Sequence, residues 1–456
     1  MEDSTRPAVR EALHADVDAL LDWVQQAAEA DLETAEQRVR AGVLELGARL
    51  LTAGLAARGT GKAGARRPCG CGGAATFEGY RPKQVQTLLG WIAVRRAYYW
   101  CPRCGRGQAP LDGALGVARD SHSPGLRRVL SRLGALVPFA QAADALAEAA
   151  GVRVAPSTVR AVAEASGARR EAAVSAAVGA AWRAGLPPTE EPAPVRLYVA
   201  MDGVRILDTR GDGKEAKVGV VVPEHRGPCG DLVRAPSSYA AGFVGAEAFG
   251  RRLALEAHRR GLETAAEVVV LGDGAEWIWN LAAEHCPGAT QVVDWFHASE
   301  RVWALGRAFY GEGTAKTEAW VERQLARLAE GEAAALVRAW RKRRCEGTAA
   351  AVRDEQVGYF THHAGRMAYD RYRARGLDIG SGMVESGCKL VIGAREKGPG
   401  RRWSVAGANA VAQLRVLLFN DQWDSHRLAA CSRQFLRAPR AGGAWGGSRL
   451  DVRRMP

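Results

Sequence analysis

Two apolar runs in this sequence each end on an aspartate followed by a glycine. The first, LYVAMDG, ends at Asp202 and Gly203, and the second, VVVLGDG, ends at Asp273 and Gly274. Runs of this length and composition predict buried strands of a sheet. A carboxylate at the end of a buried strand either opens a turn, as Asp-Gly often does, or belongs to a site. The two runs alone leave both explanations open.

Strand-like and helix-like segments alternate around these runs, which predicts an α/β domain. RLYVAMDGVRI and EAKVGVVV suit adjacent strands across the polar turn DTRGDGK, and AEAFGRRLALEAHRRG predicts an amphipathic helix that ends at Gly261. EVVVLGDG and TQVVDWFH predict two further strands, with a helix at AEWIWNLAAEHC between them. Residues 299–377 are helical and charged in pattern, and we expect them to form a helical insertion.

A third carboxylate follows that insertion. After GSGM, Glu385 is expected to start a helix in which Lys389 lies four residues on, on the same face. Asp202, Asp273 and Glu385 in this order predict an RNase H-like core, in which adjacent strands bring the aspartates together and the helix lays its glutamate across them. Three clustered acids repel one another unless they hold hard cations, so we expect two Mg²⁺ or Mn²⁺ ions there. The alternative is two turn aspartates and a Glu385–Lys389 surface pair.

Four of the nine cysteines lie in one short window, on either side of two β-like runs around KQVQTLL and WIAVRRAYYW that join at Gly90. Two cysteine turns beside a hairpin are what tetrahedral zinc requires, and such a zinc replaces a core too small to stand alone. The first pair is one residue shorter than the usual Cys-x-x-Cys, so unliganded cysteines remain the alternative. The predicted structural Zn²⁺ ligands are Cys69, Cys71, Cys101 and Cys104.

The remaining segments before the core read as helices. Residues from about 10 to 57 and from 124 to about 183 have helical spacing. Within the latter, we expect a helix-turn-helix with a first helix over 140–150, a turn at Gly151 and a second helix capped by Ser157 or Thr158. Its inward residues would be Val159, Val162 and Ala163, and its DNA contacts Arg153 and Arg160. A simple Ala-rich helical pair predicts nearly the same pattern.

The expected organisation is α/β with seven parts. They are an N-terminal helical segment (1–62), a zinc-ribbon-like segment (63–112), a helical, helix-turn-helix-like segment (113–184), the first part of the core (185–298), the helical insertion (299–377), the C-terminal part of the core (378–425) and a basic tail (426–456). We expect the tail to be disordered and to attract DNA weakly.

The net charge and the lack of long apolar runs limit which classes of partner this chain can have. Lys and Arg number 63 against 50 Asp and Glu, and the net charge of +13 attracts polyanions, although a GC-rich genome that favours Arg explains the same excess. The polar, acidic start of the sequence and the lack of a long apolar run predict no secretory signal and no membrane partner. We expect the bacterial cytoplasm.

Four motifs carry a family resemblance. MDGVRI, VVVLGDGAEWIWN, VVDWFHASERV and IGSGMVESGCKLVIGAREKGPGRRWS resemble the transposases of bacterial insertion sequences of the ISKra type, relatives of the Mutator-like transposases. The resemblance covers nearly the whole chain, and the last motif is the most specific. It implies a DDE transposase that cuts and joins DNA strands, with Asp202, Asp273 and Glu385 as the metal-binding catalytic triad.

The resemblance also implies partners and supporting residues. A transposase binds the terminal repeats of its element and target DNA at the nucleoid, and holding two ends predicts a homo-oligomer. Asp294 and His297 match the Asp-x-x-His signature of Mutator-like enzymes, and we expect them to form a buried Asp–His hydrogen bond that supports the sheet.

The segment REKGPGRRW is the expected DNA contact near the acids. Basic side chains pair with phosphates, and a glycine-rich backbone can approach a duplex closely. Trp403 stacks on an unpaired base or, equally well, anchors the loop in the core. With Lys389, which should point toward the scissile phosphate, the predicted DNA-binding residues are Arg395, Lys397, Arg401, Arg402 and Trp403.

Two other functions fit the same residues. A two-metal nuclease of this fold would cut DNA without joining it. A domesticated DNA-binding regulator would keep the zinc ribbon and helix-turn-helix while its active site idles. Joined product separates the transposase from the nuclease, and binding without metal-dependent cleavage would favour the regulator.

Overall fold

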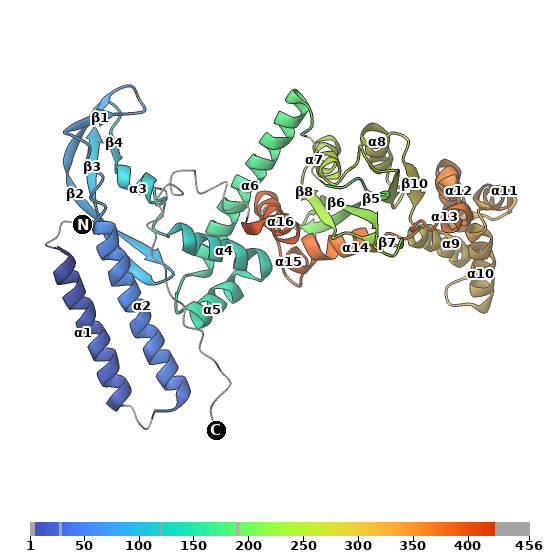
Figure 1. Cartoon of the computed structure of the whole chain (residues 1–456). Coiled ribbons are helices and arrows are strands. Elements are labelled where there is room, and N and C mark those ends of the chain that lie inside the picture. Colours follow the sequence, from blue (N-terminus) through green and yellow to red (C-terminus); the bar gives the residue numbers. More distant parts are fainter. Residues whose placement is uncertain (1–4, 27–29, 119, 188, 190, 425–456) are drawn as a thin grey trace.

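The computed structural model describes residues 5–26, 30–118, 120–187, 189 and 191–424, so the predicted basic tail lies outside the described residues (Figure 1). The chain is mixed α/β and elongated, with an N-terminal helical hairpin and small sheet at one end, a larger sheet in the middle and a group of helices at the other end. Among the helices of these ranges, none combines the length and apolar content that crossing a bilayer requires.

The N-terminal part consists of two long helices and a small antiparallel sheet. Asp31 caps the second helix by accepting a hydrogen bond from the Thr34 amide. The first long strand begins at Ala74, nine residues before Lys83, where the sequence predicted its start. The pairing of this strand with the next one shifts register between Phe77 and Gly79. The elements are α1 (Thr5–Gln26), α2 (Leu32–Ala56), β1 (Arg66–Pro68), β2 (Ala74–Thr87), β3 (Gly90–Cys101) and β4 (Arg106–Gln108), with the strands in that order across the sheet.

Four helices connect this part to the larger sheet. They are α3 (Pro110–Ala114), α4 (Pro124–Leu136), α5 (Phe139–Ala150) and α6 (Pro156–Ala184). Gly151, with φ of 66°, ends α5 as predicted, and Val159, Val162 and Ala163 of α6 are buried as predicted. The predicted cap of the second helix is wrong: Ala155 is the N-cap, and Pro156 starts the helix without a side-chain cap because its ring presets the helical φ.

The larger sheet is mixed, with the order β10-β9-β5-β6-β7 and β8 paired to β6. β5 runs antiparallel to β6 and parallel to β9, and β9 runs parallel to β10. The bounds are β5 (Arg196–Leu207), β6 (Gly213–Arg226), β7 (Leu232–Arg234), β8 (Ser238–Gly242), α7 (Ala246–Arg259), β9 (Glu267–Gly272), α8 (Glu276–His285) and β10 (Thr290–Val293).

The predicted strand TQVVDWFH is right only in its first half. β10 ends at Val293, because Asp294 accepts hydrogen bonds from two following amides and so caps a helix that begins at Trp295. The helices that follow are α9 (Trp295–Tyr310), α10 (Ala315–Ala329), α11 (Ala333–Lys342), α12 (Gly347–His363), the short 3₁₀ turn Ala364–Arg366 and α13 (Tyr369–Ala374). They form the group at the far right of Figure 1.

The chain then returns to the larger sheet through α14 (Gly382–Cys388), a π-helical turn (Lys389–Gly393), α15 (Ala394–Glu396) and α16 (Val405–Phe419). Glycines let helices approach both faces of this sheet. A Cβ at Gly219 would lie 2.6 Å from Leu253 of α7, and one at Gly387 of α14 would lie 2.6 Å from Val220. Because Gly219 and Val220 point to opposite faces, α7 and α14 cover opposite sides of β6.

Candidate active site

Asp202 and Asp273 lie next to each other at corresponding points of two parallel strands. Met201 of β5 pairs with Gly272 of β9, and each aspartate is the next residue. The Asp202 carboxylate accepts a hydrogen bond from the Gly203 amide at 2.6 Å, and that of Asp273 accepts one from the Ala275 amide at 2.8 Å. Burial raises the pKa of Asp202, and the charge of Asp273 raises it further. The pairing of β5 with β9 therefore places Asp202 and Asp273 side by side, as predicted.

Glu385 lies on α14, the helix that packs on the same sheet. Gly387 lacks a side chain and so lets this helix approach β6. Ser381 donates a hydrogen bond to Glu385 Oε1 at 3.4 Å, and Lys389 Nζ lies 4.0 Å from Glu385 Oε2, as the predicted spacing required. The half-exposed carboxylate of Glu385 therefore sits on a helix whose position the sheet fixes.

Cys388 connects this helix to the first aspartate. Its thiol donates to Asp202 Oδ2 at 3.5 Å from a buried position. Burial raises the pKa of Cys388, and the charges of Asp202 and, more weakly, Glu385 raise it further. The thiol therefore stays protonated and donates to the carboxylate. The position of Cys388, about one helical turn after Glu385, was a usable sequence signal for this contact.

The three carboxylates are close but not gathered into a metal-sized group. Among the described residues, the four cysteines form the group of three or more potential ligands whose atoms all lie within 4.8 Å of one another. Asp202, Asp273 and Glu385 do not form such a group, so their role as Mg²⁺ or Mn²⁺ ligands stays a prediction.

Asp294 has a different role from the predicted Asp–His hydrogen bond. It is fully buried, and its Oδ1 accepts hydrogen bonds from the amides of Phe296 and His297 at the start of α9. Its Oδ2 accepts one from the Ser381 amide at 2.7 Å, immediately before the helix that carries Glu385. His297 Nδ1 lies 3.7 Å from Oδ2, which is an ion-pair distance and too long for a hydrogen bond. Asp294 thus joins two segments that are 87 residues apart.

His297 brings positive charge to the acids. The Asp294 carboxylate raises the pKa of His297 to about 9, against the opposing effect of burial, and Asp273 adds to the rise. The same histidine in turn lowers the pKa of Asp202. At neutral pH the imidazolium therefore offsets part of the repulsion among the carboxylates.

The helical insertion supports the second aspartate. Tyr359 of α12 donates its hydroxyl hydrogen to the backbone oxygen of Asp273 at 2.7 Å. Gly274 has φ of 104°, and a Cβ there would lie 2.5 Å from the Tyr359 hydroxyl, so only glycine fits beneath the ring. The guanidinium of Arg301 lies 3.8 Å from the centroid of the same ring. No sequence pattern points to Tyr359, because it lies 86 residues from Asp273.

The cysteine cluster has the dimensions of a tetrahedral metal site. The Cys69 and Cys104 sulfurs are 3.7 Å apart, as are those of Cys71 and Cys101. A tetrahedral zinc with Zn–S bonds of about 2.3 Å separates its sulfurs by about 3.8 Å, whereas a disulfide would need about 2 Å. The Cys71 amide lowers the pKa of Cys69 to about 7, and burial raises that of Cys104 to about 12. The four cysteines can hold a metal such as zinc, despite the short first pair.

Two of the predicted DNA contacts are wrong. Arg395 is 2% exposed, donates a hydrogen bond to the Gly134 oxygen and lies against the rings of Phe139 and Trp403. Trp403 is also buried, and its indole donates to the Glu396 oxygen, so it anchors the loop in the core. Neither side chain is open to a nucleic acid.

The other predicted contacts remain at the surface. Arg401 is half-buried and donates to the Arg395 oxygen at 2.8 Å, which holds the loop shape. The exposed members are Lys389, Lys397 and Arg402. Lys389 directly follows the helix that carries Glu385, whereas the Arg402 guanidinium lies near Gly211 in the turn between β5 and β6.

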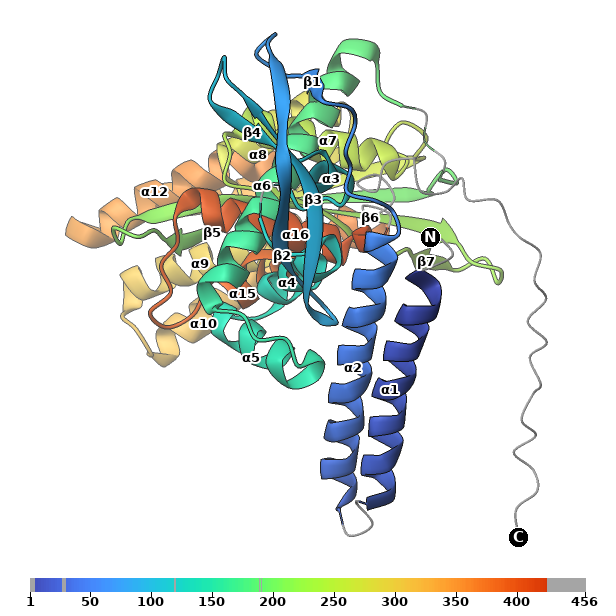
Figure 2. The same cartoon turned by 90° about the vertical axis from the view of Figure 1, so that its left-hand side faces the viewer.

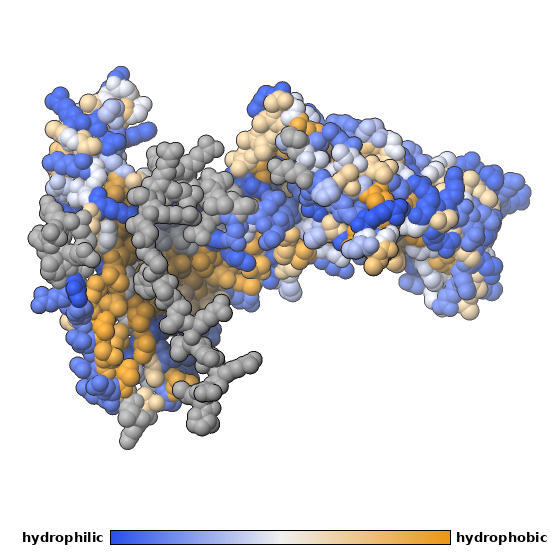
Figure 3. Space-filling model, in the orientation of Figure 1, coloured by the Kyte–Doolittle hydropathy of each residue, from blue (hydrophilic) through white to orange (hydrophobic). Residues whose placement is uncertain are grey.

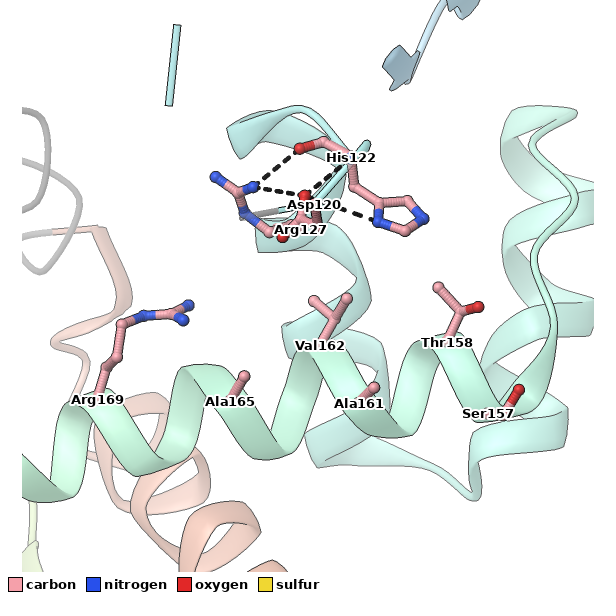
Figure 4. A pocket seen from close by; sticks show the side chains of 9 residues that line it. All are labelled: Asp120, His122, Arg127, Ser157, Thr158, Ala161, Val162, Ala165 and Arg169. Carbon is pink, nitrogen blue, oxygen red and sulfur yellow. Dashed lines mark hydrogen bonds and ion pairs between the residues drawn. The ribbon is translucent and has the colours of Figure 1, made fainter. Parts of the chain in front are cut away.

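The second helix of the predicted helix-turn-helix borders a hollow of about 310 Å³ (Figure 4). Thr158, Ala161, Val162 and Ala165 line it from α6, and Arg127 faces them from α4, held by the Asp120 carboxylate at 2.8 Å. The first turn of α6 and the exposed Arg153 and Arg160 are thus accessible, and their contact with DNA stays a prediction.

No protein-family model matches this chain, and no curated protein matches it.

Proposed function

We propose that this chain is a DDE transposase that binds the ends of its insertion sequence and carries out DNA strand cleavage and strand transfer. The observation that carries the proposal is the meeting of Asp202, Asp273 and the helix of Glu385 on one sheet, from segments that lie far apart in the sequence. Asp202 and Asp273 follow paired residues of neighbouring strands, and the thiol on the glutamate helix contacts Asp202.

The strand arrangement supports an RNase H-like core. An antiparallel run of β5, β6 and β8 is followed by α7, then by β9 parallel to β5, α8 and β10 on the outside. The resulting order is β8-β6-β5-β9-β10. In such a core the central strand and its parallel neighbour present the two aspartates, and a helix after the last strand presents the glutamate. The helical insertion α9 to α13 then separates β10 from α14.

The oxygen chemistry of the acids suits hard divalent cations. The pKa of Asp202 is raised by burial and by Asp273, and an oxygen-liganded cation would relieve this cost. When bound by Asp202, Asp273 and Glu385, two Mg²⁺ or Mn²⁺ ions supply activation of the attacking oxygen and stabilisation of the leaving oxygen. The chain itself holds the carboxylates in register through β5 and β9, and places Glu385 through Ser381 and Asp294.

The reaction needs two steps at phosphorus, a hydrolysis and then a transesterification. Water forms a bond to phosphorus at the element end, and the 3′-oxygen leaves as a free hydroxyl. That hydroxyl then attacks a phosphate of the target DNA, and the target's own 3′-oxygen leaves. The exposed Lys389, Lys397 and Arg402 are the basic side chains that would hold phosphates during both steps. The segment held by structural zinc and the exposed start of α6 would bind the ends of the element. We expect the reaction to take place in the bacterial cytoplasm.

The test is a mobility assay in cells, with the gene's flanking DNA bracketing a selectable marker, paired with strand cleavage by purified protein on the same DNA. Asp202→Asn, Asp273→Asn and Glu385→Gln should each lower cleavage and marker movement by at least about 100-fold, because each removes a metal ligand. Glu318→Gln, at an exposed position on α10, is the matched control and should behave as wild type.

Each outcome separates the candidate functions. Cleavage that is unchanged in the three acid variants overturns the proposed active site. Metal-dependent cleavage without joined product points to a two-metal nuclease. Specific binding of the flanking DNA without cleavage points to a DNA-binding regulator.

A further inference from the structure

The helical hairpin formed by α1 and α2 carries an apolar face that the rest of the described chain does not cover. Large aliphatic side chains on both helices are open to solvent, with exposed fractions of 54% at Leu21, 53% at Val43 and 82% at Leu32. Figure 3 shows this face as a continuous apolar band along the hairpin at the left of the molecule. We define the hairpin face by Val17, Leu21, Val24, Leu32, Val39, Val43 and Leu50.

The hairpin face is separate from the contacts that hold the hairpin together. Positions 39, 43, 46 and 50 follow the spacing of one helical stripe, as do 17, 21 and 24. The seam between the helices lies elsewhere, where Leu20 packs on Gly42 and Asp16 pairs with Arg49 at 2.7 Å.

The same face is also separate from the contacts that attach α2 to the body of the protein. Ala48, Leu51 and Leu55 pack on the small sheet, and Arg40 donates to backbone oxygens at the end of α5. The hairpin otherwise projects away from the body, as Figure 2 shows. Within the described residues, these contacts of α2 leave the hairpin face uncovered.

Charge argues against nucleic acid as the occupant. Residues 5–56 contain five arginines and no lysine, against nine aspartates and glutamates, although the whole chain carries +13. This local excess of acid repels phosphates and anionic lipid headgroups. The side chains of the face itself are aliphatic and uncharged, so another protein surface of the same apolar character fits them.

We propose that the hairpin face is the dimer interface of this chain, with the same face of a second copy as its occupant. Two helices of about 33 Å placed side by side, about 20 Å wide, present a face of roughly 660 Å². This projected area approaches the roughly 800 Å² that each partner contributes to a standard protein interface. A two-fold axis would place aliphatic stripe on aliphatic stripe, so that four helices share one apolar core.

The biological role that we assign to this interface rests on the proposed function, whereas the interface itself does not. A transposase must hold two element ends together, and the hairpin adjoins the cysteine-bearing sheet through α2. Dimerisation through the hairpin face would pair two sets of DNA-binding segments while it leaves the carboxylates of both cores free.

The test measures the mass of the full-length chain in solution, without DNA, by sedimentation across a range of micromolar concentrations. The wild type should sediment as a dimer of twice 48.7 kDa. The double variant Leu21→Glu, Val43→Glu places one charge on each helix of the face, and should weaken dimerisation by about 100-fold or more. Val233→Glu, at an exposed valine of β7, is the matched control and should dimerise as wild type.

The controls keep folding and catalysis apart from assembly. Both changed positions are exposed and Glu is a good helix former, so helix content and zinc content should equal those of the wild type. Asp202→Asn should dimerise normally, so failure of the active-site proposal would leave this result intact. A wild type that stays monomeric at every concentration, or a dimer that the double variant leaves unweakened, would overturn the proposed interface.

Discussion

The two candidate metal centres of this protein are built in opposite ways. The cysteine centre comes from one stretch of the chain, Cys69 to Cys104, and a single hairpin brings its four sulfurs together. The acid centre draws on residues from Asp202 to Glu385 and depends on a parallel strand pair, a returning helix and an inserted group of helices. A local site is specified by spacing, whereas a long-range site is specified by the fold.

Their surroundings differ in the same sense. The cysteine centre has a small core of Ala75, Ala97, Tyr99 and Cys101. The acid centre adjoins a continuous core that includes both faces of the larger sheet and the helices of the insertion. A metal held by the four cysteines would therefore stand in for apolar burial around the cysteine centre. Around the acid centre, apolar burial fixes the backbone that carries the acids.

The largest expected effect is loss of the metal at the cysteine centre. Cys101→Ser removes a buried ligand at the end of β3, and structural zinc contributes on the order of 10 kcal/mol to such small domains. We expect zinc content to fall to near zero and the segment around residues 63–112 to become protease-sensitive, while the larger sheet stays folded. Cys229→Ser, at an exposed cysteine outside the cluster, should retain zinc. Full zinc content in Cys101→Ser would contradict the four-cysteine site.

The next largest effect concerns the long-range tie at the acid centre. Asp294→Ala removes the cap of α9 and leaves the Ser381 amide without its acceptor, so we expect unfolding free energy to fall by about 3 kcal/mol. Asp294→Asn keeps a capping oxygen but turns an amide group toward Ser381, and should cost about 2 kcal/mol. Chemical denaturation measures both.

The same variants compare the two centres directly. Zinc content should be unchanged in both Asp294 variants, because the cysteine centre shares no contact with Asp294, whereas DNA cleavage should fall with the displaced Glu385 helix. Asp354→Asn, at an exposed position of α12, is the control. Stability equal to wild type in Asp294→Ala would show that the tie to Ser381 is not structural.

A smaller effect isolates the contribution of the insertion. Tyr359→Phe removes only the hydroxyl that binds the Asp273 oxygen, and should lower stability by about 1 kcal/mol. Cleavage should fall by about tenfold, with a higher Mg²⁺ requirement, because the turn that presents Asp273 is less well held. Tyr310→Phe, whose hydroxyl meets Arg343 within the insertion, should lose similar stability but no cleavage. If Tyr359→Phe and Tyr310→Phe cleave DNA equally well, the Tyr359 hydroxyl does not support the acid centre.

The sequence predicted what is local in this structure. Apolar runs and their length were enough for β5, β6 and β9, and cysteine spacing was enough for the metal cluster, because each depends on neighbours in the chain. Helical periodicity predicted the buried side of α6, but not its start, since Pro156 replaced the expected side-chain cap.

What the sequence could not predict depends on distant partners. Arg395 lies in a basic, glycine-rich stretch that suggests DNA contact, yet the rings of Phe139 and Trp403 bury its guanidinium. Asp294 ended a strand early because its carboxylate satisfies amides of two segments at once. Tyr359 reaches Asp273 only because the insertion folds back on the sheet. In each case the deciding neighbour is more than 80 residues away or competes with local propensity.

The last predicted effect depends on pH and concerns Glu396, which lies beside Arg395 where the larger sheet meets the preceding helices. Glu396 is 1% exposed, and in the described part of the chain neither carboxylate oxygen has a hydrogen-bond partner. Burial raises the pKa of Glu396 well above its ordinary value, although Arg415 and Arg395 oppose the rise. The folded protein therefore holds a proton that the unfolded chain releases above about pH 4.5, and stability falls as pH rises toward the folded pKa.

Glu396→Gln removes this dependence because glutamine is neutral at every pH. We expect the variant to match the wild type at pH 4 and to exceed its unfolding free energy by about 1 to 2 kcal/mol at pH 8. Glu318→Gln, at an exposed glutamate, should show no such divergence. Parallel stability curves for Glu396→Gln and wild type from pH 4 to 8 would mean that Glu396 is ionised in the folded protein. Its charge would then be balanced by Arg395 and Arg415, and the junction would contain an ion-pair network instead of a neutral carboxyl group beside two arginines.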